Sequence, residues 1–374
     1  MFYHLVYKLS VYFSPFNVFK YITFRTAYAA ITAFLFCLIV GPYFIKKLKE
    51  MKIQHQRGEE KLDHHLDKVG TPTMGGALIL GAIFFSMILW GNFANVYVWI
   101  VLIVSLLLGI VGFVDDYLKW TYADSKGLKA HYKFLAQIVI ATGVAAYLYI
   151  YPIKGLNLWS PERFIDMKFG YCLTAPFLKN FVVYLGVFYI PFVVLVIVGS
   201  SNAVNLTDGL DGLAIGCVIF TALALSVFTY LTGHFKFSQY LNLNFIRESS
   251  ELTVFLGAMI GAGMGFLWFN AHPASIFMGD TGSLSLGGVI GTIVVLIKQE
   301  IVLLIIGGIF VIEALSVILQ VAYFKITGGK RLFMMSPIHH HFELKGLHES
   351  KIIVRFWIVA ILLALIGLST IKLR

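Results

Sequence analysis

The sequence predicts an all-α polytopic integral membrane protein with about ten transmembrane helices. Of its 374 residues, 59% are hydrophobic and only 13% are charged, whereas about a quarter of the residues are charged in a typical soluble domain. Long apolar runs recur along the chain, for example at 98–114, 182–198 and 352–366. This composition excludes a soluble enzyme, a disulfide-stabilised scaffold and a disordered chain.

Ten segments are long and apolar enough to form the predicted helices, and we treat residues 1–374 as a single transmembrane domain. Their predicted ranges are 26–45, 73–91, 97–114, 134–151, 182–199, 212–231, 252–269, 284–297, 301–324 and 354–371. The eighth segment is short and is expected to end in a tight turn at 298–300. Because the number of segments is even, both termini are expected on the same side of the membrane.

The basic residues predict the orientation of these helices. More than half of the 29 lysines and arginines lie in three loops, at 46–68, 119–133 and 325–355. The positive-inside rule places such loops in the cytoplasm and therefore places both termini outside it. This topology accounts for the net charge of +10, so no nucleic-acid partner is expected. The three cysteines are scattered and predict neither a disulfide framework nor a CxxC metal pair.

Five aspartates lie at the ends of the predicted helices. They occupy three places: the end of the third helix (Asp115 and Asp116), the link between the fifth and sixth (Asp208 and Asp211) and the link between the seventh and eighth (Asp280). All three places fall on the cytoplasmic face in the predicted topology. A carboxylate at membrane depth is costly unless it is paired, hydrated or bound to a cation.

A single aspartate of this kind is equally well explained as a turn residue or a helix cap. Five that meet at one face, with Asn202, Asn205 and Asn270 beside them, favour a binding site instead. Oxygen ligands suit a hard divalent cation, and Mg²⁺ typically joins one or two carboxylates to the phosphates of a substrate. The sequence therefore predicts an active site with Mg²⁺ at the cytoplasmic face.

Two basic elements are expected on the same face. Lys68 and Thr73 precede the second helix, where an ammonium and a hydroxyl group suit an oxyanion, although topology alone also explains the lysine. His339, His340 and His341 are adjacent, so they are not expected to bind one zinc ion together. In an extended loop, one or two of them are able to reach a phosphate or a sugar.

Glu313 and Gln320 are polar residues inside the predicted ninth helix. They lie seven positions apart and so share one helix face. A functional site and hydrogen bonding between helices explain them equally well.

These residues together suit chemistry on a diphosphate, where electrostatic stabilisation is the largest contribution to catalysis. A lipid phosphate is already largely ionised at neutral pH, so such an acceptor needs positioning more than a strong base. The residues alone thus predict phosphoryl or glycosyl-phosphate transfer from a nucleotide sugar to a lipid phosphate.

The motifs resemble those of the phospho-N-acetylmuramoyl-pentapeptide transferase family, within the polyprenyl-phosphate sugar-1-phosphate transferase superfamily. The resemblance runs nearly from end to end, through FNVFKYITFR, KVGTPTMGG, GFVDDYLK, NAVNLTDGLDGLA, GFLWFNAHPASIFMGDTGSLSLGG, SVILQV, PIHHHFELKG and IVRFWI. The aspartate motifs are typical of the superfamily, and PIHHHFELKG with KVGTPTMGG is typical of this family. The resemblance implies transfer of phospho-MurNAc-pentapeptide from UDP-MurNAc-pentapeptide to undecaprenyl phosphate, with Mg²⁺ as cofactor and release of UMP. It also implies the bacterial inner membrane and a homodimer.

The resemblance implies roles for individual residues. Asp280 is similar to the family's metal ligand, and Asp115 and Asp116 are similar to its essential pair near the lipid phosphate. His339, His340 and His341 match further catalytic positions. The predicted substrate-binding residues are Lys68, Thr73, Asn202, Asn205, Asp208, Asp211, Asn270 and Phe277, with Phe277 stacking on uracil. Direct attack by the lipid phosphate is favoured over a covalent aspartyl intermediate, because the acceptor is already an anion.

Other functions remain open at this point. A sibling enzyme that transfers GlcNAc-1-phosphate to the same lipid predicts the same aspartates but not PIHHHFELKG. A cation-coupled transporter predicts polar residues near the middle of the membrane, whereas most of the polar residues here lie at one face. A purely structural membrane protein leaves the five aspartates unexplained.

Overall fold

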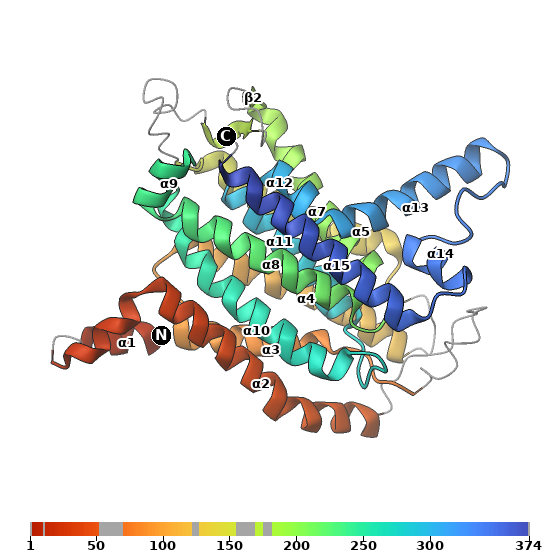
Figure 1. Ribbon diagram of the computed structural model, residues 1–374, viewed down its shortest axis with the longest axis horizontal. Coiled ribbons are helices and arrows are strands. Elements are labelled where there is room, and N and C mark those ends of the chain that lie inside the picture. Colours follow the sequence, from red (N-terminus) through yellow and green to blue (C-terminus); the bar gives the residue numbers. More distant parts are fainter. Residues whose placement is uncertain are drawn as a thin grey trace.

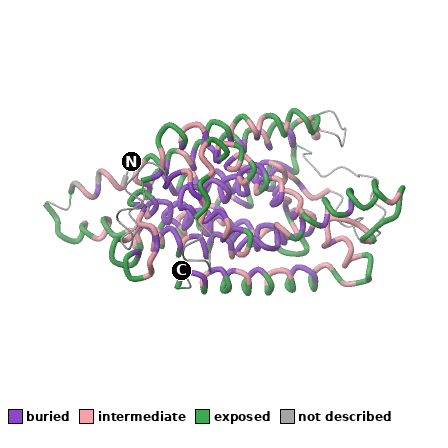
Figure 2. Tube along the Cα trace, turned by 90° about the horizontal axis from the view of Figure 1, so that it is seen from above, coloured by how far each residue is buried: buried purple, intermediate pink, exposed green. Residues whose placement is uncertain are grey.

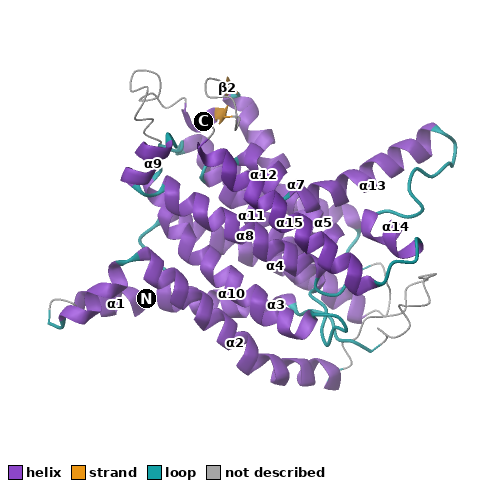
Figure 3. Cartoon of the chain, in the orientation of Figure 1, coloured by secondary structure: helices purple, strands orange, loops and turns teal. Residues whose placement is uncertain are grey.

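The computed structural model describes residues 2–9, 12–51, 70–121, 127–154, 169–174 and 182–372, and most of them are helical (Figure 3). In this part of the chain, nine helices are long and apolar enough to cross a membrane, and α3 is a shorter apolar helix. The predicted class, an all-α multi-pass membrane protein, is confirmed.

The elements are named in chain order in Figure 1. The helices are α1 (Phe2–Lys8), α2 (Ile22–Glu50), α3 (Gly76–Trp90), α4 (Val96–Thr121), α5 (Ala130–Ile150), α7 (Tyr189–Thr207), α8 (Leu213–Thr232), α9 (Phe235–Leu241), α10 (Leu252–Asn270), α11 (Gly279–Leu296), α12 (Glu300–Ile306), α13 (Gly308–Ile326), α14 (Ile338–Leu344) and α15 (Glu349–Ser369). Short 3₁₀ helices lie at Ser14–Lys20, Phe169–Tyr171, Gly186–Phe188, Arg247–Glu251 and Thr370–Lys372. Two short strands, β1 (Cys172–Thr174) and β2 (Val182–Tyr184), pair in an antiparallel hairpin.

Two of the predicted helices have different boundaries. The segment predicted at 182–199 begins as strand β2, so its helix α7 starts only at Tyr189 and continues to Thr207. Pro191 lies in the first turn of α7, where the N–H that proline lacks has no partner within the helix. The segment predicted at 301–324 is interrupted at Gly307, which separates α12 from α13. The other eight predicted segments each coincide with one helix.

Helix α11 forms the centre of the bundle. Every residue from Thr281 to Leu296 is buried, and α11 packs against α3, α4, α7 and α8. Helices α8 and α10 are also largely buried, whereas α2, α5, α13 and α15 expose many apolar side chains. Figure 2 shows the buried residues gathered in the middle of the bundle and the exposed residues along its outside. An apolar surface of this extent suits contact with lipid.

The two ends of the bundle differ. Both chain termini lie at one end, and α14 lies at the other (Figure 1). Trp90, at the end of α3, contacts Arg25 near the start of α2, so α3 also ends at the end that holds the termini. Helix α4 starts close by and runs back, so Asp115 and Asp116 lie at the end that holds α14.

A buried ion pair joins three helices at the end that holds the termini. Both terminal nitrogens of Arg25 donate to the Glu251 carboxylate at 2.7 Å, and Arg25 Nη1 also donates to the carbonyl oxygen of Trp90 at 3.3 Å. The Arg25 side chain is only 1% exposed. Removing one member of a buried pair leaves the other charge without its partner in a region of low dielectric constant.

We therefore expect Glu251→Ala to lower the free energy of unfolding by about 3 to 5 kcal/mol. The measurement is the midpoint of thermal unfolding of the purified protein in detergent. Glu248→Ala is the matched control, because Glu248 is an exposed glutamate three residues away. Equal midpoints for the two variants would show that the Arg25–Glu251 pair contributes nothing to stability.

Candidate active site

Three of the predicted aspartates meet at one end of the bundle and form what we call the aspartate cluster: Asp115 and Asp116 on α4, and Asp280 on α11. One carboxylate oxygen from each lies within 4.8 Å of the others. The close approach of α4 to α11 depends on Gly112, because a Cβ there would collide with the Asp280 carbonyl oxygen. A glycine on α4 thus brings residues 165 positions apart into one site.

Asp116 holds the start of α11. Its Oδ1 accepts from the backbone N–H of Asp280 at 3.1 Å, and its Oδ2 accepts from the N–H of Thr281 at 3.0 Å and the hydroxyl of Thr281 at 2.7 Å. The first N–H groups of a helix have no partner within the helix and carry partial positive charge. Asp116 therefore supplies both hydrogen bonds and compensating charge, and it fixes the backbone that carries the Asp280 side chain.

Two lysines neutralise the aspartate cluster. Lys119 Nζ lies 2.7 Å from Asp115 Oδ2 and 2.9 Å from Asp280 Oδ2. Lys133 Nζ, from α5, lies 2.6 Å from the same Asp280 oxygen. The Lys119 side chain is 38% exposed, so this side of the cluster is open. Topology alone was sufficient to explain both lysines in the sequence, although the spacing from Asp115 to Lys119 is that of an ion pair on one helix face.

The turn between α7 and α8 adds polar groups from a third direction. Asn205 Nδ2 donates to Asp280 Oδ1 at 2.6 Å and to the Ser283 hydroxyl at 2.8 Å. Burial, together with the negative charges of Asp280, Asp116 and Asp211, raises the pKa of the Asp208 carboxyl to about 8, although a hydrogen bond from the Gly279 N–H opposes the shift. A cation bound nearby would favour the ionised form of Asp208.

Thr73 and Phe277 are brought next to this site by backbone pairing. The Phe277 N–H donates to the Pro72 carbonyl at 2.8 Å, and the Gly75 N–H donates to the Phe277 carbonyl at 2.9 Å. The Thr73 hydroxyl lies beside Gly279, where a Cβ would stand 3.0 Å from it. Lys68, the other candidate in this segment, lies outside the described residues.

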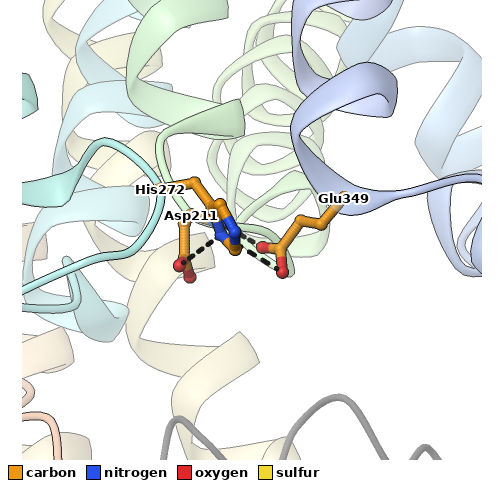
Figure 4. Close-up of side chains that lie close together, drawn as sticks. All are labelled: Asp211, His272 and Glu349. Carbon is orange, nitrogen blue, oxygen red and sulfur yellow. Dashed lines mark hydrogen bonds and ion pairs between the residues drawn. The ribbon is translucent and has the colours of Figure 1, made fainter.

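Asp211 belongs to a second group, formed with His272 and Glu349 (Figure 4). Asp211 Oδ2 lies 3.2 Å from His272 Nδ1 and accepts from the Ala274 N–H at 3.0 Å, while the Asp211 N–H donates to Glu349 Oε1 at 2.9 Å. Neither His272 nor Glu349 was predicted as a site residue: His272 lies within the quoted motif GFLWFNAHPASIFMGDTGSLSLGG but was given no role, and Glu349 lies in none of the quoted motifs. This group ties the turn after α7 to the segment after α10 and to the first turn of α15.

Asn270 strengthens the same connection. Its Oδ1 accepts from the Gly212 N–H at 3.0 Å, and its Nδ2 donates to the Ile276 carbonyl at 2.8 Å. Asn202 lies one turn before Asn205 on α7 and donates to Gln137 Oε1 and to the Val198 carbonyl. The hydrogen bonds of Asn202 are therefore made to α5 and α7, away from the aspartate cluster.

The three histidines lie on a short helix, α14, and not in an extended loop. Successive residues of a helix point about 100° apart, so the three rings have different surroundings. His339 is 0% exposed with Nδ1 at 3.1 Å from Glu313 Oε2, whereas His340 Nδ1 lies 2.6 Å from Glu343 Oε2. His341 Nδ1 accepts from the Met334 N–H at 3.1 Å.

Known proteins resemble this chain over part or all of its length. The family model for glycosyl transferase family 4 matches residues 98–298, which include the aspartate cluster and the turn after α7. The chain is similar to proteins named phospho-N-acetylmuramoyl-pentapeptide transferase from Desulforapulum autotrophicum (51% identity), Thermodesulfovibrio yellowstonii (50%) and Desulfatibacillum aliphaticivorans (51%). Each alignment extends over 374 residues and covers 100% of both proteins.

Proposed function

Because the chain belongs to the phospho-N-acetylmuramoyl-pentapeptide transferase family, we infer that it transfers phospho-MurNAc-pentapeptide from UDP-MurNAc-pentapeptide to a lipid phosphate. The product is lipid I, the first lipid-linked precursor of peptidoglycan, and UMP is released. The acceptor is undecaprenyl phosphate. The observation that carries this function is the aspartate cluster, with two lysines on its open side, at one end of an apolar helix bundle.

The cluster fits Mg²⁺ by its chemistry. Its donors are carboxylate oxygens from Asp115, Asp116 and Asp280, which converge within 4.8 Å, and hard cations prefer oxygen ligands. We assign Asp280 as the metal ligand, because its carboxylate stands between the other two aspartates and Asn205. When bound, Mg²⁺ supplies neutralisation of the charge that develops on the diphosphate.

Lys119 and Lys133 bind the anionic substrates. Their ammonium groups are held on the aspartate cluster by ion pairs and point to its open side. A diphosphate that enters there forms ion pairs with the two lysines, partly in place of Asp280, and these ion pairs orient it before the reaction. Asn205 supplies a neutral donor to the other Asp280 oxygen, Oδ1, and the Thr73 hydroxyl lies next to Gly279, the residue before Asp280.

The reaction is a direct displacement. An oxygen of the lipid phosphate attacks the phosphorus that bears the sugar, a new P–O bond forms, and the bond to the UMP oxygen breaks. No base is needed to activate the acceptor, since a phosphate monoester is largely ionised at neutral pH. The chain's own contribution is therefore orientation and charge stabilisation by the lysines and the Asp116-capped start of α11.

The same proposal gives the protein its place in the cell. The aspartate cluster lies at the cytoplasmic face of the bacterial inner membrane, both termini lie outside the cytoplasm, and the enzyme acts as a homodimer. The positive-inside rule supports this orientation, because the lysine-rich loops join the helix ends that carry the aspartates.

The direct test measures UMP release by the purified protein from UDP-MurNAc-pentapeptide and undecaprenyl phosphate, with Mg²⁺ and after removal of Mg²⁺ by EDTA. We expect UMP only when Mg²⁺ is present. UDP-GlcNAc serves as the matched donor and is expected to release none. Release from UDP-GlcNAc alone would assign the chain to the sibling activity, and silence with both donors from folded protein would refute a transferase.

A further inference from the structure

Helix α13 carries two polar side chains on one face, Glu313 and Gln320, and they contact α14 and the segment that precedes it. Gln320 Oε1 accepts from the N–H groups of Leu332 and Phe333, at 3.1 and 2.8 Å, in the segment that leads to α14. One end of that face thus fixes the approach to α14. Glu313, two turns earlier, contacts α14 itself.

Glu313 and His339 form a pair inside the protein. Glu313 Oε2 lies 3.1 Å from His339 Nδ1, and both side chains are 0% exposed. An ionisable group in such surroundings is costly, and its presence points to a function for the pair. The pair lacks the alignment of a hydrogen bond, so Glu313 acts on the His339 ring by its charge and by close packing, which restrict the orientation of the ring.

The other side of the His339 ring meets the turn between α7 and α8. A Cβ on Gly209 would collide with His339 Nε2, so the ring packs directly on the backbone of this glycine. Gly209 follows Asp208 and lies two residues before Asp211. A continuous set of contacts therefore runs from Glu313 through His339 to the turn that carries both aspartates.

We propose that Glu313 is a positioning residue for the transferase reaction: through His339 it sets the turn that holds Asp208 beside the aspartate cluster and Asp211 beside His272. The inference rests on the proposed function. Neither Glu313 nor His339 has any exposed surface, so we assign their action to the contact of the ring with the backbone at Gly209. Of the three histidines, only His340 and His341 are left partly accessible to substrate.

The test is a double-mutant cycle with Glu313→Gln and His339→Ala. Glu313→Gln is expected to lower kcat by about 10- to 100-fold, as is usual when the carboxylate that orients a functional histidine is removed, with little change in KM for UDP-MurNAc-pentapeptide. If Glu313 acts through His339, adding Glu313→Gln to His339→Ala changes kcat by no more than about twofold. Gly209→Ala probes the same contact from the other side, and its effect is expected to disappear in the His339→Ala background.

Glu300→Gln is the matched control. Glu300 is the other glutamate with 0% side-chain exposure among the described ion pairs, and it pairs with Lys298 just beyond the far end of α11. We expect it to lower the thermal unfolding midpoint and to leave kcat unchanged.

Three results would overturn the proposal: a wild-type kcat for Glu313→Gln, an equal loss in both backgrounds of the cycle, or an equal loss of kcat for Glu300→Gln. An inactive wild-type protein would instead refute the proposed function, so the two failures are distinguishable.

Discussion

Asp280→Asn is expected to abolish lipid I synthesis in a protein that still folds. Asp280 is the only residue of the aspartate cluster that contacts Lys119, Lys133 and Asn205 together. The substitution removes one negative charge, so it weakens the binding of Mg²⁺ and releases the ammonium groups from their fixed positions. We expect a loss of at least about 100- to 1,000-fold in kcat, the range observed when one electrostatic group of an active site is removed.

The fold is expected to survive this change, because the backbone N–H of Asp280 and its hydrogen bond to Asp116 are unaffected. The measurements are UMP release and Mg²⁺ binding by calorimetry, with the thermal unfolding midpoint as the check of folding. Glu248→Gln, an exposed carboxylate at the opposite end of the bundle, is the control for loss of one negative charge. Near-normal turnover by Asp280→Asn would contradict the metal assignment.

Asp116→Asn is expected to damage both activity and stability. Asp116 offers two oxygens to three donors at the start of α11, whereas asparagine offers one oxygen and an NH₂ group. One donor is therefore left without an acceptor in a buried site, which costs about 1 to 3 kcal/mol. Since the start of α11 carries Asp280, we also expect kcat to fall by about 10- to 100-fold, as for other groups that position a catalytic side chain.

The comparison of the two variants is informative. Thermal unfolding in detergent is expected to show a lower midpoint for Asp116→Asn than for Asp280→Asn, while UMP release shows the larger loss for Asp280→Asn. A larger loss of UMP release for Asp116→Asn than for Asp280→Asn would mean that Asp116 contributes to catalysis directly. An unfolding midpoint for Asp116→Asn that is no lower than that of Asp280→Asn would mean that the hydrogen bonds from Asp116 to α11 are of little importance.

The helices were predictable because each needs a long apolar run, and that requirement is visible in a single sequence. The two wrong boundaries arose where apolarity does not report backbone conformation. Strand β2 is as apolar as the helix that follows it, and Gly307 interrupts a run that is apolar on both sides.

The aspartates were predictable for a related reason, since a carboxylate at the end of a membrane helix demands an explanation. Lys119 and Lys133 were not predictable as site residues, because the positive-inside rule already explains a lysine in a predicted cytoplasmic loop. The three histidines were given the same role because their adjacency in the sequence does not show where each side chain points. Only the helical conformation of α14 distinguishes the buried His339 from its neighbours.

The placement of Lys119 and Lys133 has a consequence for the energetics of catalysis. Two fully hydrated ammonium groups would lose their hydration shells when the substrate binds, and the free-energy cost of that dehydration would oppose each turnover. Here both groups already form ion pairs with Asp280, so part of this dehydration has occurred on folding, more for Lys133 than for the more exposed Lys119. The incoming diphosphate exchanges with a carboxylate rather than with solvent, and the active site starts every cycle with its positive charges in place.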